Sequence, residues 1–64
     1  MLIETKDQEL IATVLRNIYN LEVVPDDIFY GERIPDRDEL MIKFHYKGIV
    51  RTQQISGLDL VRYS

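Results

Sequence analysis

The side chains with the most chemical potential are a group of acids and a single histidine. Asp36, Asp38 and Glu39 stand close together, and His45 is the only histidine of the chain. Two carboxylates two positions apart in a loop can share a cation, so a metal site made by these acids and His45 is one interpretation. The spacing of an EF-hand is missing, however, and Arg37 lies between the acids. A solvated, charged loop is the better explanation of this segment.

Catalysis by His45 would require further groups that the sequence does not supply. A general base needs a nucleophile in a turn or at a helix start, and Thr52 falls in the middle of an expected strand. Glu39 and Lys43 are four positions apart, about 13 Å along a strand, which is too far to share one metal and one water. The three glycines are isolated, so the sequence contains no glycine-rich phosphate loop. We therefore predict no enzyme, and no catalytic, cofactor-binding or metal-binding residues.

The charges are distributed unevenly along the chain. Residues 1–40 hold ten acids and four bases, whereas residues 41–64 hold one acid and four bases, so the two parts carry −6 and +3. The bases and aromatic residues of 40–55 could contact phosphates and stack on nucleobases. The net charge of −3 disfavours this, and Lys43 and Arg51 would point to opposite faces of the expected hairpin. The same asymmetry suits electrostatic attraction between two copies, or between the chain and a protein partner.

The length limits how much interior the chain can build. We expect residues 1–64 to form a single small domain and, because they begin with Met1, a complete gene product. A domain of this size buries only roughly 60% of the surface that its unfolded chain exposes, and no cysteine is present to form a disulfide. Oligomerisation or partner binding is then the remaining way to add stability. No apolar run suits a secretion signal or a membrane span of about 20 residues, so we expect a cytoplasmic protein without a membrane partner.

An amphipathic helix is predicted near the N-terminus. Thr5 and Gln8 have the spacing of a capping box, and Asn20 suits a left-handed residue at the C-terminus, with Leu21 packing back. Between these ends, apolar residues recur at helical spacing: Leu10, Ile11, Val14, Leu15, Ile18 and Tyr19. Their arc is roughly 180° wide, broader than the ~100° stripe that packs on one surface. The helix therefore either touches a second element or partner chain besides its own sheet, or has residues that only border the core.

Two alternating segments, 40–46 and 49–55, predict a β-hairpin with Lys47-Gly48 as its turn. Pairing Tyr46 with Ile49 makes the inner face of the first strand apolar and that of the second mixed, so we expect the second strand at a sheet edge. Residues 25–31 suggest a short helical turn, and residues 31–39 a surface loop. Residues 58–63 fit a third strand, which we favour, or a short helix.

The predicted fold is α+β, with one N-terminal amphipathic helix packed on a two- or three-stranded antiparallel sheet and a short helical turn between them. We predict a small non-enzymatic regulatory, inhibitory or assembly module that acts through protein–protein contacts, as a homo-oligomer or with a protein partner. The alternative is a nucleic-acid-binding protein that uses the basic hairpin 40–55. The residues expected to contact a partner lie on the helix, on the following turn and on the edge strand: Leu15, Tyr19, Phe29, Tyr30, Arg51, Gln53 and Gln54.

Overall fold

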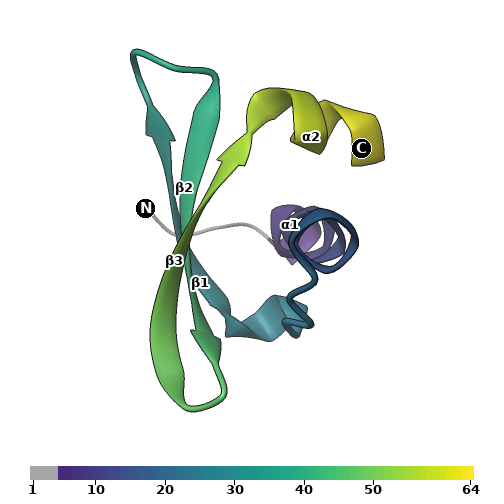
Figure 1. Cartoon of the computed structure of the whole chain (residues 1–64), viewed down its shortest axis with the longest axis vertical. Coiled ribbons are helices and arrows are strands. Elements are labelled where there is room, and N and C mark those ends of the chain that lie inside the picture. Colours follow the sequence, from purple (N-terminus) through teal and green to yellow (C-terminus); the bar gives the residue numbers. More distant parts are fainter. Residues whose placement is uncertain (1–4) are drawn as a thin grey trace.

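The computed structural model describes residues 5–64, with side chains from residue 7 onwards. The elements follow in the order α1 (Thr5–Tyr19), the 3₁₀ turn η1 (Pro25–Asp27), β1 (Ile28–Ile34), β2 (Glu39–Tyr46), β3 (Ile49–Ser56) and α2 (Gly57–Tyr63). The three strands form one antiparallel sheet in the order β1-β2-β3, and both helices lie on the same side of it (Figure 1). The predicted α+β fold is confirmed.

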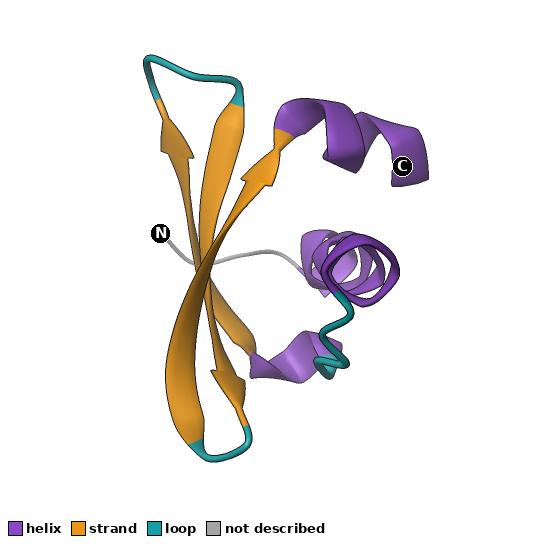
Figure 2. Ribbon diagram, viewed as in Figure 1, coloured by secondary structure: helices purple, strands orange, loops and turns teal. Residues whose placement is uncertain are grey.

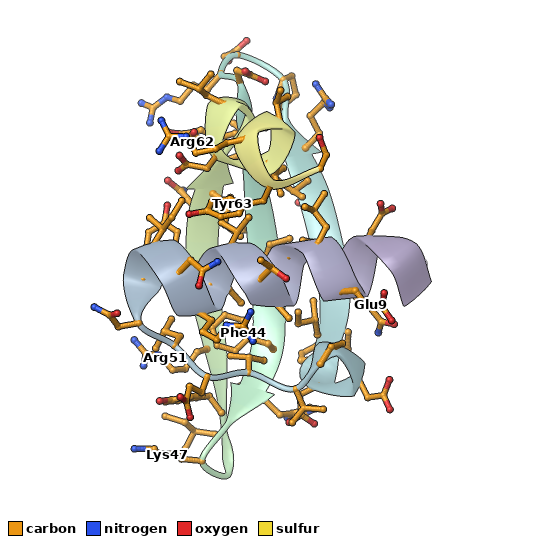
Figure 3. All side chains as sticks on the ribbon, turned by 90° about the vertical axis from the view of Figure 1, so that its right-hand side faces the viewer. Glu9, Phe44, Lys47, Arg51, Arg62 and Tyr63 are labelled. Carbon is orange, nitrogen blue, oxygen red and sulfur yellow. The ribbon has the colours of Figure 1, made fainter. Side chains whose placement is uncertain are left out.

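The core lies between α1 and one face of the sheet. α1 crosses the strands at a steep angle (Figure 3) and buries Ile11, Val14 and Leu15. The strands contribute four completely buried side chains to the same cluster: Ile28, Ile42, Phe44 and Ile55. Ile18 and Tyr19 are partly buried against this cluster. α1 also contacts the C-terminal helix α2 (Figure 1), so the wide apolar arc touches a second element besides the sheet, which was one of the two interpretations. Ile18 and Tyr19 border the core, as the other interpretation stated.

Both ends of α1 are fixed by specific contacts. Asn20 has a φ of 57°, as predicted for a left-handed C-terminal residue, and the buried Leu21 donates its backbone N–H to the Leu15 carbonyl oxygen at 3.0 Å. Thr5 is the first residue of α1 rather than its predicted cap, and its side chain lies outside the described residues. Gln8 donates its side-chain amide to the Ile28 carbonyl oxygen at 2.8 Å, which ties the first turn of α1 to β1.

The third strand lies where the sequence predicted a turn and a loop. The helical turn is confined to Pro25–Asp27, and residues 28–34 pair with β2 as strand β1. Ile28, Phe29 and Tyr30 are residue types that favour strands, and Gly31 continues the ladder opposite Ile42 instead of ending the segment. The register shifts between Ile28 and Tyr30, which is a bulge at Phe29. The predicted loop is therefore wrong for residues 31–34 and correct only for the four residues of the β1–β2 turn.

The C-terminal segment is a helix, not the strand that we favoured. Ser56 caps α2 because its hydroxyl oxygen accepts a hydrogen bond from the Asp59 backbone N–H at 3.1 Å. A serine followed three residues later by an acid is a capping signal, and it prevails over the apparent alternation of Leu58 and Leu60. Leu60 packs against the core, whereas Leu58 is exposed.

The predicted β2–β3 hairpin is confirmed in both its turn and its register. Tyr46 pairs with Ile49, and the two turn residues, Lys47 and Gly48, have φ values of 51° and 81°. Positive φ at both positions defines the type I′ turn, whose twist matches that of the flanking strands. β3 also lies at the edge of the sheet, as predicted.

Candidate protein-binding edge at strand β3

The hairpin register determines which backbone groups of β3 are used within the sheet. Tyr46 and Ile49 flank a two-residue turn and so form a hydrogen-bonded pair, and such pairs alternate with non-hydrogen-bonded pairs along an antiparallel ladder. Arg51 and Gln53 therefore direct their N–H and C=O groups at β2.

The residues between them direct the same groups away from the sheet. Val50, Thr52 and Gln54 fall on the non-hydrogen-bonded positions of the ladder, so their backbone donors and acceptors face outwards. In the part of the chain that the structure describes, no strand lies on this side of β3. An unpaired row of this kind is a template for a further strand.

Gln54 lies at the end of this row away from the hairpin turn, and its carbonyl oxygen is already hydrogen-bonded. The Tyr19 hydroxyl donates to the Gln54 carbonyl oxygen at 3.2 Å, and the Gln53 side-chain amide donates to the same oxygen at 3.0 Å. The C-terminal end of α1 thus reaches the edge of β3. The open part of the edge, which we call the β3 edge, comprises the outward groups of Val50 and Thr52 and the side chains of Ile49 to Thr52.

The fold also lowers the acidity of the Tyr19 hydroxyl. Partial burial raises the pKa of its hydroxyl above the ordinary value, and the carboxylates of Asp59 and Glu39 raise the pKa further. All three effects disfavour the charged phenolate. The hydroxyl therefore stays protonated, and able to donate to Gln54, through the neutral pH range.

The two faces of the β3 edge differ in chemistry. On the side of the helices, the Arg51 guanidinium carbon lies 5.5 Å from the centre of the Tyr46 ring, and the Lys47 ammonium nitrogen lies 5.4 Å from it. These distances are those of cation–π contacts. On the opposite side, Val50 and Thr52 present β-branched side chains, and Val50 is 56% exposed. The helix side of the edge therefore carries two cations beside the exposed Ile49, whereas the open side carries the β-branched Val50 and Thr52.

The other edge of the sheet is less suited to pairing. β1 carries the bulge at Phe29, which interrupts its regular spacing, and Glu32 and Arg33 place opposite charges along it. Bulges and charged residues are devices that block strand addition. β3 runs from Ile49 to Ser56 without a register shift.

The sheet face opposite the helices holds a second group of aromatic and basic side chains. The described helices all lie on the other side of the twisted sheet (Figure 2). On the open face, the Phe29 and His45 rings stack with their centres 4.7 Å apart, and the Lys43 ammonium nitrogen lies 5.2 Å from the centre of the Tyr30 ring. The predicted contact residues Phe29 and Tyr30 therefore lie on this face and not at the β3 edge.

The remaining predicted contacts separate into an accessible and an inaccessible group. Tyr19, Arg51, Gln53 and Gln54 come together at or beside the β3 edge. Leu15 is completely buried in the core and offers no surface to a partner.

The residues of the β3 edge that sequence reasoning missed are Ile49, Val50 and Thr52. Ile49 is 61% exposed although its type is apolar. The predicted register already contained the signal, because pairing Tyr46 with Ile49 puts Val50 and Thr52 on the non-hydrogen-bonded positions of the ladder.

Charged residues from the two parts of the chain meet at the hairpin end of the molecule. Arg16, His45 and Lys47 line an open groove of about 630 Å³ at the hairpin end of the molecule, together with Glu22 and Asp27. Acids of the first part of the chain and bases of the second part thus share one surface. Electrostatic attraction between two copies stays a prediction.

The structure does not assemble the metal site considered above. Glu39 and His45 lie near opposite ends of β2. Among the described residues, no group of three or more His, Cys, Asp or Glu side chains is placed to hold a metal ion. No described helix has the length and apolar character needed to cross a membrane.

No model of a known protein family matches the chain, and neither a curated protein nor a solved structure does. The β3 edge, with its unpaired backbone groups, is the feature of the molecule that points most directly to a function.

Proposed function

We propose that the protein is a small non-enzymatic module with a regulatory, inhibitory or assembly role, and that it acts through protein–protein contacts at the β3 edge. The observation that carries this proposal is the outward row of backbone groups at Val50 and Thr52. A strand from another chain satisfies such a row by main-chain hydrogen bonds. The exposed side chains of Ile49 and Val50 would be covered by the same contact. The cytoplasmic location stays a prediction.

A binding experiment with a single surface variant tests the proposal. Immobilised wild-type protein and a Val50→Lys variant are exposed to nuclease-treated cell extract. Val50 is more than half exposed on the open side of the sheet, so a lysine there leaves the core intact. We expect wild type to retain specific proteins that Val50→Lys loses, while a matched Glu32→Lys variant at the β1 edge retains them. Identical protein sets on all three would contradict the proposal, as would a wild type that retains nucleic acid alone before nuclease treatment.

Nucleic-acid binding through the open face is the second candidate. The stacked pair of Phe29 and His45 and the ammonium group of Lys43 could hold a base and a phosphate. The net charge of −3 and the presence of Glu32 on the same face oppose this function. If it operates, affinity for single-stranded oligonucleotides falls steeply with salt and falls again on Lys43→Ala.

A further inference from the structure

We propose that the β3 edge takes an extended segment of a partner polypeptide as a fourth strand, and that this segment alternates acidic with apolar β-branched residues. The inference rests on the proposed protein-binding function and deepens it by stating the chemistry of the partner. It follows from three properties of the edge: its length, its two unlike faces and the composition of β3 itself.

The length of the edge sets the length of the segment. Pairing begins after the turn at Lys47-Gly48 and stops at Gln54, where Tyr19 and the Gln53 amide already bond to the carbonyl oxygen. Val50 and Thr52 offer two N–H and two C=O groups in between. A segment of about five residues, roughly 17 Å when extended, spans this stretch.

The helix side of the edge selects acidic residues. Arg51 and Lys47 both lie over the Tyr46 ring, and Arg51 is exposed. The one ion pair with an N–O distance within 4.0 Å among the described residues joins Arg37 to Glu39, at the end of the sheet away from the hairpin turn. The two cations at the edge therefore have no carboxylate partner within that distance in the described part of the chain. A carboxylate of an added strand opposite Arg51 would meet both positive charges.

The open side of the edge selects apolar residues. Val50 and Thr52 stand next to each other on this side of β3, and cross-strand pairs of β-branched side chains stabilise a sheet. Because side chains alternate along a strand, a partner that places acids towards Arg51 places its other residues towards Val50 and Thr52. The favoured pattern is thus Val-Glu-Val-Glu-Val or a close equivalent.

A second copy of β3 does not satisfy this pattern. The strand from Ile49 to Ser56 contains no acid. In an antiparallel pair of two β3 strands centred on Thr52, Arg51 would face Gln53 of the other copy, and in a pair centred on Arg51 two arginines would face each other. Like charges directly opposite each other destabilise a sheet. The edge therefore favours a strand whose sequence differs from that of β3.

Titration with two synthetic peptides tests the inference. One peptide contains Val-Glu-Val-Glu-Val and the other Val-Lys-Val-Lys-Val, each with capped ends, and binding to the intact 64-residue chain is followed by amide NMR and by fluorescence anisotropy. We expect the Glu peptide to bind about tenfold more tightly, because attraction to Arg51 and Lys47 is replaced by repulsion in the Lys peptide. Hydrogen exchange at the Val50 and Thr52 amides should slow only in the presence of the Glu peptide.

A charge reversal provides the control. Arg51→Glu should abolish the preference for the Glu peptide, because the new carboxylate offsets the remaining charge of Lys47. Arg33→Glu, the same change at the exposed β1 edge, should leave the preference unchanged. Equal binding of the two peptides, perturbations away from the β3 edge, or protection of Val50 and Thr52 by a second copy alone would overturn the inference. The extract experiment separates this failure from failure of the proposed function. If the peptide results contradict the inference but Val50→Lys still abolishes partner capture from extract, the proposed function survives while its acidic specificity fails. If Val50→Lys also leaves partner capture unchanged, the proposed function and the acidic specificity both fail.

Discussion

Lys47 holds a backbone conformation that lysine adopts rarely. Its φ of 51° and the φ of 81° at Gly48 form the type I′ turn of the β2–β3 hairpin. Asparagine is the residue most favoured at the first of these positions. A Cβ atom built on Gly48 would meet no atom within 4 Å, so any cost of a side chain there is purely conformational.

Substitutions in this turn should change stability in opposite directions. We expect Lys47→Asn to raise the free energy of unfolding by about 0.5 kcal/mol, and Gly48→Ala to lower it by about 1 kcal/mol. Urea denaturation at neutral pH measures both. Because Lys47 is also one of the two cations over Tyr46, Lys47→Asn should weaken binding of the Glu peptide while it stabilises the fold. A Lys47→Ala variant, which also lacks the contact with Tyr46, is the matched control, and a Lys47→Asn protein no more stable than Lys47→Ala would contradict the type I′ turn.

The stabilisation that Tyr19 provides should depend on pH. Its pKa is raised in the folded state by burial and by Asp59 and Glu39, so the folded chain holds this proton more tightly than the unfolded chain does. The resulting stabilisation is complete below the ordinary tyrosine pKa of about 10 and is lost as the pH rises through the higher folded value. Tyr19→Phe lacks this titration.

We therefore expect the stability difference between wild type and Tyr19→Phe to stay constant up to about pH 10 and to fall as the pH rises further. At neutral pH the difference should be about 1 kcal/mol in favour of wild type, the net contribution of one hydrogen bond. Urea denaturation of both proteins across this pH range provides the measurement. A difference that stays constant above about pH 10 would mean that the fold does not raise the pKa of the Tyr19 hydroxyl.

At the scale of elements, α2 depends on its cap. The helix has only seven residues, from Gly57 to Tyr63, and Ser56 supplies the hydroxyl that accepts from Asp59. Ser56→Ala should cost about 1 kcal/mol and should loosen the contact of Leu60 with the core. Ser64→Ala, at the other end of the same helix, should cost much less because Ser64 is exposed. Thermal melts of the two variants and of wild type measure these costs. Equal decreases of the melting temperature in Ser56→Ala and Ser64→Ala would contradict the capping role of Ser56.

Sequence patterns predicted the elements whose signals are local. α1 has a helical period with Asn20 at its end, and the hairpin has two alternating segments around Lys47-Gly48. β1 was missed because Gly31 and a bulge at Phe29 break its alternation. α2 was assigned to a strand because Leu58 and Leu60 alternate, although Ser56 and Asp59 carry a cap signal. In both cases the deciding contact lies with a neighbouring element or a cap, which periodicity does not describe.

The residues of the candidate site were predicted only in part, because periodicity does not show which surface the chain itself covers. Arg51, Gln53 and Gln54 were found because the mixed inner face of the second strand indicated an edge. Leu15 was included because a wide apolar arc does not reveal whether its own chain covers it, and the structure buries Leu15 completely. Which backbone groups of β3 point outwards follows from the register.

At the scale of the whole molecule, residues 7–64 build their core on one side of the sheet. Phe44 is completely buried between α1 and the sheet, whereas Phe29 lies on the opposite face and is 37% exposed. A chain of this length has roughly 3–10 kcal/mol of stability in total. Phe44→Ala should cost about 3–5 kcal/mol and leave much of the protein unfolded at 37 °C. Phe29→Ala should cost far less, and circular dichroism melts of the two variants distinguish them. Similar losses would imply a second layer on the open face.

The central claim is that β3 presents unpaired backbone groups to a partner, and amide hydrogen exchange in the isolated protein tests it most directly. The measurement is made residue by residue along β3 at low protein concentration, without peptide. We expect an alternating pattern, with fast exchange at Val50 and Thr52 and slow exchange at Arg51 and Gln53, whose N–H groups bond to β2. Slow exchange at Val50 and Thr52 under these conditions would show that the edge is already closed and would contradict the claim.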